Sequence, residues 1–288
     1  MSYCIITRDD IKSKSITKEL KSKIKAKYDE ENPKCVIAVG GDGTLLRAFH
    51  LYPNSTIFGL HTGHLGFYSN FFVSDIDTIA KAINEDSYNI EEIDLIEVDF
   101  IDGYGNHYHD KALNEVTIVG PTRTLRIDVY IGNNFFEHFR GTGFCISTPT
   151  GSTAYNKSLN GSVVDPSLKC IQLTEIAAIN SNAYRTISSP MVLGIDKIIE
   201  LKSDDTHNTN AFVTVDDKPY SLDTFREMKV YTSKSKLKMA YHNRQDFLSR
   251  ISRTFLNDNK WNQREKNSLF LMKGLYFNDK TFTSLKWV

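Results

Sequence analysis

The stretch that decides the fold is residues 34–46, which read KCVIAVGGDGTLL. After its first residue, the run from Lys34 to Val39 is apolar and as long as one strand. Such a run is typical of a parallel sheet that is covered on both faces. Glycines on either side of Asp42 end the run, and apolar side chains from Leu45 to Phe49 follow at helical spacing. The stretch therefore predicts a strand, a glycine-rich turn and a helix, in that order.

The segments around this stretch repeat the alternation of strand and helix. Residues 3–7 and 56–60 are short β-prone runs. Residues 15–28 carry an apolar side chain at every fourth position, which predicts a helix. Residues 74–83 predict another helix, with Ser74 as its N-cap. This order predicts βαβ units and an open, largely parallel sheet.

The pattern changes near residue 90. Residues 125–131 alternate apolar and polar side chains and precede a Gly-Asn-Asn turn, which predicts a β-hairpin. Many short strands after an alternating half indicate a second, all-β domain. Further short strands are predicted at residues 198–201, 212–215, 228–231 and 237–239.

Three parts of the chain follow from these patterns. We predict an α/β domain over residues 1–92 and an all-β domain over residues 93–243, with the boundary between Ser87 and Asp94. Residues 244–288 predict a helical or irregular C-terminal tail. Its apolar side chains on one helical stripe are Phe247, Leu248, Ile251 and Phe255.

The composition predicts a globular protein in a reducing compartment. The chain has 35 Lys and Arg residues and 35 Asp and Glu residues, and this balance argues against a general nucleic-acid or polybasic membrane binder. Its apolar runs are shorter than the ~20 residues that cross a bilayer, and its start lacks the pattern of a secretory signal. The cysteines show neither a C-x-x-C pair nor zinc spacing, so we expect reduced thiols and a cytoplasmic location. They are Cys4, Cys35, Cys145 and Cys170.

The GGDGT sequence at residues 40–44 is the first candidate site. Glycines let backbone N–H groups approach a phosphate, and the start of the following helix favours negative charge. A carboxylate there would repel phosphate, so Asp42 suggests another task, such as accepting a proton from an attacking hydroxyl or meeting a metal ion. The alternative is a tight Asp-Gly turn at the end of a strand. The motif is neither a Walker A loop nor a dinucleotide G-x-G-x-x-G motif.

Two later segments are further candidates. Asn114 and Glu115 could bind sugar hydroxyls, although a solvated strand end is the simpler interpretation of that pair alone. Residues 140–156 gather small residues and hydroxyls, which together with free backbone amides can bind a phosphate or an adenine edge. The segment also holds Tyr155, which can stack on or pack against a ring. Taken alone, this segment is more simply interpreted as a surface loop.

Together and in this order, the segments resemble the NAD kinase family. The resemblance rests on GGDGTLL at residues 40–46, LNE at 113–115 and STPTGSTAY at 147–155. It extends from the N-terminus to about residue 258 and is closest to bacterial members from Gram-positive organisms. Further similar stretches lie at residues 61–68, 156–159, 173–177 and 185–190.

The resemblance implies both a fold and an activity. NAD kinases have an N-terminal α/β domain and a C-terminal all-β domain, with the active site between them. They transfer the γ-phosphate of ATP, or polyphosphate in some members, to the 2′-hydroxyl of the adenosine ribose of NAD, giving NADP. The resemblance also implies Mg²⁺ with ATP, and a homodimer or homotetramer in which a neighbouring subunit completes the NAD site.

Roles for individual residues are implied in the same way. Asp42 would be the general base, and Asn114 and Glu115 would hold the ribose hydroxyls. Phe67 and Tyr68 would line the adenine pocket. The phosphate loop would be Gly40, Gly41, Gly43 and Thr44, with Gly43 also at the NAD. The NAD-binding segment would be Thr150, Thr153, Ala154, Tyr155, Asn156, Lys157 and Ser158. The nicotinamide end and the subunit interface would include Arg140, Thr142, Ala177 and Ile179. No metal ligand is assigned.

Departures from the family pattern leave alternatives open. Thr142 stands where many relatives carry an aspartate that touches the dinucleotide, and Asp217 follows Asp216 where close relatives have His or Gly.

Lipid and sugar kinases also use GGDGT, and a member that has lost turnover would act as an NAD(P) sensor. The segment at residues 259–288 is expected either to cover apolar surface or to contact another subunit.

Overall fold

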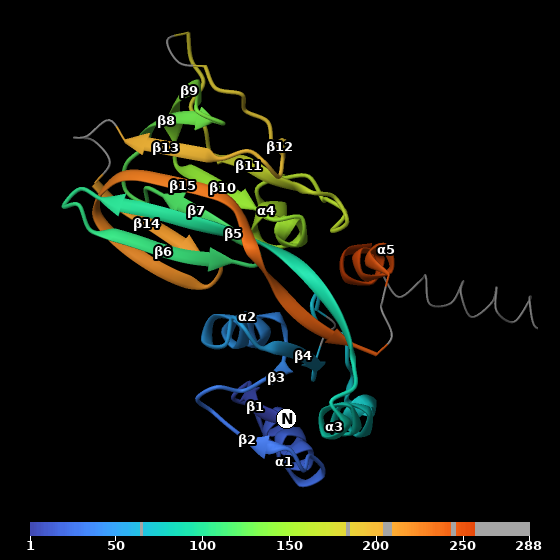
Figure 1. Ribbon diagram of the computed structural model, residues 1–288. Coiled ribbons are helices and arrows are strands. Elements are labelled where there is room, and N and C mark those ends of the chain that lie inside the picture. Colours follow the sequence, from blue (N-terminus) through green and yellow to red (C-terminus); the bar gives the residue numbers. More distant parts are fainter. Residues whose placement is uncertain (64–65, 183–184, 204–208, 243–245, 257–288) are drawn as a thin grey trace, which may run out of the picture. The chain divides into compact units, whose positions relative to one another are not determined.

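The computed structural model describes residues 1–63, 66–182, 185–203, 209–242 and 246–256 (Figure 1). The chain forms two compact units, Met1–Arg244 and Gln245–Val288.

A parallel sheet is the centre of the first part of the larger unit. β3 (Cys35–Gly40) pairs with β1 (Ser2–Thr7) on one side and with β4 (Thr56–His61) on the other. β2 (Lys27–Tyr28) lies beside β1, and the end of β15 (Lys218–Tyr241) lies parallel to β4. β3 ends where GGDGT begins, so this loop lies at the carboxyl edge of parallel strands, where ligands bind in open α/β sheets.

Helices cover both faces of this sheet, which explains why the β3 run is apolar throughout. α1 (Ile11–Lys23) and α3 (Ile76–Glu85) pack against one set of alternate β3 side chains, among them Ile37. α2 (Asp42–Leu51) packs against the other set, among them Val36. Figure 1 shows α2 on the side of β3 and β4 opposite to α1 and α3.

Antiparallel strands form most of the rest of this unit. β5 (Asn89–Asp102) pairs along β15, and the sheet continues from β15 in the order β14, β7, β10, β11, β12. β6 pairs with β5, whereas β13, β8 and β9 follow one another on from β15. Side chains of both sets share one core, in which Phe100 and Phe144 are fully buried. The remaining bounds are β6 (His107–Ala112), β7 (Glu115–Val119), β8 (Leu125–Ile131), β9 (Asn134–Gly141), β10 (Gly143–Ser147), β11 (Cys170–Ile176), β12 (Met191–Gly194), β13 (Ile199–Ser203), β14 (Thr209–Val215), the 3₁₀ turn η2 (Thr150–Thr153) and α4 (Tyr155–Ser158).

The predicted fold class is confirmed, because an α/β part with parallel strands precedes a β-rich part. The strands predicted at residues 125–131, 198–201 and 212–215 correspond to β8, β13 and β14. The predicted turn between β8 and β9 is also present. Gly132 (φ 58°) and Asn133 (φ 68°) both have positive φ, which a type I′ hairpin turn requires.

The helix predicted over residues 15–28 is wrong over its last five residues. α1 ends at Lys23, because the side chain of Asn84 binds the chain there. The Asn84 amide donates to Lys23 O (3.1 Å), and its oxygen accepts the backbone N–H of Lys25 (2.7 Å). Tyr28 lies in β2 instead. A residue far along the chain therefore ends a helix whose apolar pattern continues.

Ser74 is not the N-cap that its sequence context predicts. Val73–Asp75 form a 3₁₀ turn, and α3 begins at Ile76. The Asp75 carboxylate accepts the backbone N–H of Phe72 (2.8 Å), so the acidic residue next to Ser74 makes the contact that fixes the start of this segment.

The two short strands predicted at residues 228–231 and 237–239 are one strand, β15. Its pairing with β5 shifts register between Thr232 and Lys236, so the polar residues between the two runs form a bulge and not a turn. β5 runs through the predicted boundary between Ser87 and Asp94 as a continuous strand. The limits of the two domains therefore stay a prediction.

The described part of the smaller unit is a short helical segment. α5 (Phe247–Ile251) is capped by Asp246, whose carboxylate accepts the backbone N–H of Ser249 (3.0 Å), and a π-helical turn (Ser252–Leu256) follows. Of the tail predicted over residues 244–288, the described part is residues 246–256, and the segment at residues 259–288 lies outside the described residues.

Two expectations from composition can be compared with the structure. All four cysteines are free thiols, as expected, although Cys170 is only partly buried. Among the helices of the described residues, none has the length and apolar character needed to cross a bilayer.

Candidate active site

Asp42 is the first residue of α2, at the helix end that favours negative charge. Its carboxylate accepts hydrogen bonds from the backbone N–H groups of Phe67 (2.8 Å) and Tyr68 (3.2 Å). Two donors from a different loop thus fix the orientation of the carboxylate. Gly40, Gly41, Gly43 and Thr44 lie beside it at the junction of β3 and α2.

The glycines around Asp42 serve two different purposes. A Cβ at Gly66 would lie 2.1 Å from the Asp42 carboxylate, so only glycine leaves room for that carboxylate. A Cβ at Gly41 or Gly43 would have no atom within 4 Å. The backbone at Gly41 and Gly43 is therefore open to an approaching ligand.

Asp216 holds the turn that carries Asn114 and Glu115. Its side chain is fully buried, and its carboxylate accepts the backbone N–H groups of Leu113 (2.9 Å), Asn114 (2.7 Å) and Glu115 (3.3 Å). Three successive N–H groups make a nest for one carboxylate. Asn114 and Glu115 are each only 7% exposed. The interpretation of this pair as a solvated strand end is therefore wrong.

Glu115 is a protonated acid near neutral pH. Burial raises the pKa of its carboxyl group, and the negative charge of Asp216 raises it further, to about 8. A backbone hydrogen bond from Tyr155 acts in the opposite direction. The protonated group can donate as well as accept a hydrogen bond, and it lacks the charge that would repel a phosphate.

Tyr68 connects the phosphate loop with this turn. Its backbone N–H binds the Asp42 carboxylate, and its hydroxyl donates to Asn114 Oδ1. Burial raises the pKa of Tyr68 well above its usual value, so the hydroxyl keeps its proton and remains a donor. A single residue therefore relates the position of Asp42 to that of Asn114.

The STPTGSTAY segment packs directly onto the same turn. Thr148 donates from its backbone N–H to Asn114 O (2.9 Å) and from its hydroxyl to Leu113 O (2.7 Å). A Cβ at Gly151 would lie only 2.0 Å from Asn114 O, so this approach requires glycine. Most of the segment is buried, and the surface-loop interpretation is wrong.

The rest of the predicted NAD-binding segment is divided between the site and its support. The hydroxyl of Thr150 lies 3.0 Å from that of Thr148, and Tyr155 is 44% exposed. Asn156 is fully buried, and its Oδ1 accepts the hydroxyl of Thr174 (2.7 Å) on β11, so it supports the segment from behind. Thr153 is buried and Ala154 half-buried, whereas Lys157 and Ser158 are exposed. We refer to Asp42, Phe67, Tyr68, Asn114, Glu115, Thr150 and Tyr155 as the Asp42 cluster.

The other predicted NAD contacts lie at the opposite end of β10. The N–H of Thr142 donates to Ile176 O (2.9 Å), and that of Ile179 donates to Arg140 O (2.8 Å). β10 has 5 residues, a length of about 17 Å. Within one chain it holds these residues apart from the Asp42 cluster. We refer to Arg140, Thr142, Ala177 and Ile179 as the Arg140 cluster; Ala177 and Ile179 are exposed.

A magnesium site made by the protein alone is not apparent. The described residues contain no group of three or more His, Cys, Asp or Glu side chains that could hold a metal ion. Mg²⁺ that arrives with a nucleotide needs only one or two carboxylates besides phosphate oxygens. Asp42 is such a carboxylate at the phosphate loop, so the residues present fit a nucleotide-bound ion.

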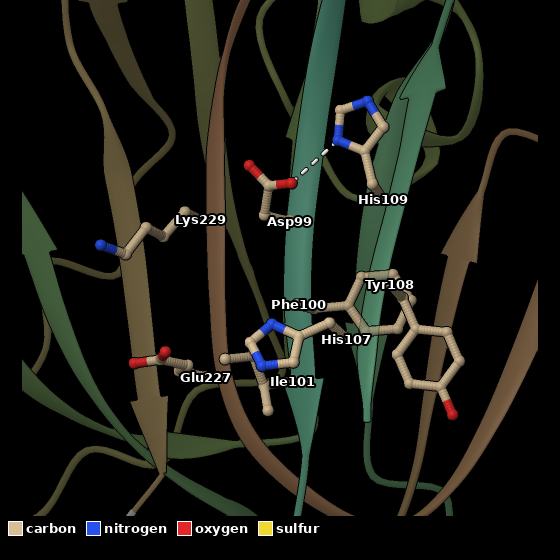
Figure 2. A pocket seen from close by; sticks show the side chains of 8 residues that line it. All are labelled: Asp99, Phe100, Ile101, His107, Tyr108, His109, Glu227 and Lys229. Atoms are coloured by element: carbon tan, nitrogen blue, oxygen red, sulfur yellow. Dashed lines mark hydrogen bonds and ion pairs between the residues drawn. The ribbon is translucent and has the colours of Figure 1, made fainter. Parts of the chain in front are cut away.

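A pocket of about 290 Å³ on β5, β6 and β15 contains none of the predicted site residues. Figure 2 shows its side chains, among which His109 Nδ1 binds Asp99 Oδ1 at 2.8 Å. The remaining lining residues are Phe100, Ile101, His107, Tyr108, Glu227 and Lys229.

His50 was not among the residues predicted from the sequence. Its Nε2 lies 3.0 Å from Asp216 Oδ2, near the last turn of α2. Burial opposes protonation of His50, but the hydrogen bond to Asp216 and its charge outweigh burial and raise the pKa of the imidazole, with smaller effects of Asp110 and Asp217. The sequence feature that could have pointed to His50 is its position on the helix that begins with Asp42.

Glu137 and Glu175 form a second acidic pair, on β9 and β11, in which Glu137 is buried and Glu175 half-buried. Glu137 accepts the backbone N–H of Ile187 (2.9 Å), and Glu175 accepts the hydroxyl of Thr186 (2.8 Å). Burial, followed by a shared hydrogen bond with Glu175, raises the pKa of Glu137 to about 7. The pair therefore holds a proton at mildly acidic pH and anchors the segment that follows the Arg140 cluster.

Replacing Glu137 with glutamine is expected to weaken the pH dependence of stability. The native carboxyl has its pKa raised from 4.5 to about 7, so the folded state binds the proton more tightly than the unfolded state. The contribution of Glu137 to stability therefore falls as pH rises from about 4.5 to about 7 and levels off above. Glu137→Gln stays neutral, so its urea midpoint should fall less than that of the wild type between pH 5 and pH 8.

Glu200→Gln is the matched control for this prediction. Glu200 is also a buried strand carboxylate, but Lys202 (3.2 Å) and Lys229 (3.6 Å) neutralise it. This variant should keep the wild-type slope between pH 5 and pH 8. An unchanged slope in Glu137→Gln would mean that the pair does not hold a proton in that range.

Two family profiles match the chain. The ATP-NAD kinase N-terminal domain matches residues 7–88, and the ATP-NAD kinase C-terminal domain matches residues 113–242. The chain belongs to the ATP-NAD kinase family. The predicted family and the predicted enzyme class, an NAD kinase, are confirmed.

Relatives from Gram-positive bacteria match nearly the whole chain. The NAD kinase of Latilactobacillus sakei subsp. sakei is 39% identical over 264 residues, which cover 89% of this chain and 98% of that protein. The NAD kinase of Geobacillus stearothermophilus is 37% identical over 265 residues, which cover 89% of this chain and 97% of that protein.

Two solved structures share the fold of this NAD kinase family member. Yeast NADH kinase complexed with NADH has a TM-score of 0.75 at 18% identity, covering 99% of this chain and 90% of that one. An NAD kinase from Archaeoglobus fulgidus in complex with ATP has a TM-score of 0.69 at 22% identity, covering 88% of this chain and 98% of that one. At these identities the likeness concerns the fold.

Proposed function

We propose that this chain transfers the γ-phosphate of ATP to the 2′-hydroxyl of the adenosine ribose of NAD, giving NADP and ADP. One observation carries the proposal: Tyr68 joins Asp42, at the phosphate loop, to Asn114 in the turn that also holds Glu115. A proton acceptor, a phosphate loop and two groups suited to ribose hydroxyls therefore belong to one hydrogen-bonded unit.

The reaction needs alignment more than a strong nucleophile. Phosphoryl transfer passes through a loose transition state, in which the new bond to the 2′-oxygen forms as the bond to the leaving ADP oxygen breaks. Asp42 is the proposed base that orients the 2′-hydroxyl and takes its proton. The open loop and the N-terminus of α2 bind phosphate, and Mg²⁺ that accompanies ATP supplies counter-charge.

We assign the proposed contacts with NAD from the exposure of the side chains in the Asp42 cluster. Tyr68 is buried and holds Asn114, so we assign the adenine contact to Phe67 and to the exposed ring of Tyr155. Asn114 and the protonated Glu115 are the proposed partners of the ribose hydroxyls.

A second copy of the chain is the proposed source of the remaining contacts. The Arg140 cluster lies about 17 Å away along β10, so it is not part of the Asp42 cluster of its own chain. We propose a dimer or tetramer in which this cluster meets the Asp42 cluster of a neighbour. Thr142 then offers a hydroxyl, without the charge of the aspartate in many relatives. A cytoplasmic location is proposed with this assembly.

The decisive experiment is a coupled assay for NADP formation from purified protein, NAD, Mg²⁺ and ATP, with polyphosphate as donor in parallel. NADP with ATP would support the proposal, and the parallel reaction would define the donor range. NAD binding without NADP would favour a sensor. Neither binding nor turnover would favour a lipid or sugar acceptor.

A further inference from the structure

Hydrogen bonds form a closed path that begins and ends on α2. Asp42, at the start of the helix, binds the backbone of Tyr68, and the Tyr68 hydroxyl binds Asn114. The backbone N–H of Asn114 binds Asp216 (2.7 Å), and Asp216 binds His50 (3.0 Å) on the same helix. We refer to this path as the α2 circuit.

His50 closes the α2 circuit from the far end of the helix. Asp42 and His50 are eight residues apart, about 12 Å along a rigid α-helix. The turn of Asn114 is thus attached to α2 at two points, through Tyr68 near the start and through Asp216 near the end. Attachment at one point would allow the turn to pivot, whereas attachment at two fixes its orientation.

The hydrogen bond between His50 and Asp216 matters because Asp216 is a buried carboxylate. The Asp216 side chain is fully buried, and in the part of the chain that the structure describes its partners besides His50 are the backbone N–H groups of Leu113 to Glu115. His50, whose side chain is 17% exposed, is the one side-chain donor to Asp216 among the described residues. Loss of that donor leaves one lone pair of a buried carboxylate unsatisfied, and the nest must then shift to compensate.

We propose that His50 is a positioning residue, which sets the ribose-holding turn of Asn114 and Glu115 relative to Asp42 through Asp216. The inference rests on the function proposed above. His50 itself touches no substrate in this arrangement. Its effect is on how NAD lies against the base, and the phosphate loop at the start of α2 does not depend on it.

The test compares His50→Asn with His50→Gln in the full-length protein. The amide nitrogen of glutamine is the same number of bonds from Cα as Nε2 of histidine, whereas that of asparagine is one bond closer and cannot reach Asp216. We expect His50→Asn to raise KM for NAD by roughly 10- to 100-fold, the effect of losing one hydrogen bond to a charged group. KM for ATP should change less than about twofold, and His50→Gln should restore most of the affinity for NAD.

His109→Asn is the matched control. His109 also binds an aspartate, Asp99, at a similar distance (2.8 Å; Figure 2), but this pair is about half exposed and outside the α2 circuit. His109→Asn should leave KM for NAD and KM for ATP unchanged. If His50→Asn lost active protein without a change in KM for NAD, or raised both KM values alike, the positioning role would be refuted. Failure of the wild type to form NADP would instead refute the proposed function.

Discussion

Replacing Asp42 with asparagine is expected to lower kcat for NADP formation by about 10²–10⁴-fold while the Kd for NAD stays close to that of the wild type. Asparagine keeps an oxygen that can accept a backbone N–H of Phe67 or Tyr68, so the loop should keep its shape. It cannot take the proton of the 2′-hydroxyl. The measurements are kcat from the coupled assay at saturating ATP and NAD, and Kd from calorimetry.

Asp77→Asn controls for the general loss of a carboxylate. Asp77 lies on α3, across the sheet from α2, where its side chain is 84% exposed and pairs with Lys23. This variant should retain wild-type kcat. If Asp42→Asn also retained it, the proton of the 2′-hydroxyl must leave by another route, and Asp42 would only hold the loop of Phe67 and Tyr68.

Elements with a strong local pattern could be predicted from the sequence. The strand, turn and helix of residues 34–51 follow from a buried apolar run, glycines and helical spacing, and the structure has them as β3 and α2. The hairpin at Gly132 and Asn133 is equally local, because both positions need positive φ. In these places, the local pattern of residues was enough to predict the element.

Features that depend on distant residues could not be predicted in this way. Residues 232–235 read TSKS, which looks like a turn, yet pairing with β5 turns them into a bulge within one long strand. The end of α1 depends on Asn84, which is 61 residues beyond the carbonyl that it caps. No local sequence pattern predicts either contact.

The candidate site shows the same division. The GGDGT loop and the STPTGSTAY segment could be selected from the sequence, by residue type and by resemblance. Their assembly around the buried carboxylate of Asp216 could not be predicted from the sequence. Asp216 lies 102 residues from Asn114 and 166 residues from His50 along the chain. The low exposure of Asn114 and Glu115, and hence the protonated state of Glu115, follow from that assembly alone.

Replacing Gly151 with alanine is expected to raise KM for NAD by about 10- to 100-fold and to lower the urea midpoint of unfolding. The added Cβ would lie 2.0 Å from Asn114 O and 2.6 Å from Asn114 Cα. Both are backbone atoms that cannot rotate away, so either the turn of Asn114 or the segment at Gly151 must move. Overpacking of this kind costs roughly 1–3 kcal/mol.

The displacement should reach NAD affinity because both elements that would move carry proposed NAD contacts. Gly194→Ala is the control, since its Cβ would meet only the end of the Asp196 side chain (2.8 Å), which can turn aside. It should keep KM and stability near wild type. If Gly151→Ala lost stability but kept its KM for NAD, the turn and the segment would tolerate displacement independently. NAD would then be held by groups other than those that the close packing of Gly151 against Asn114 brings together.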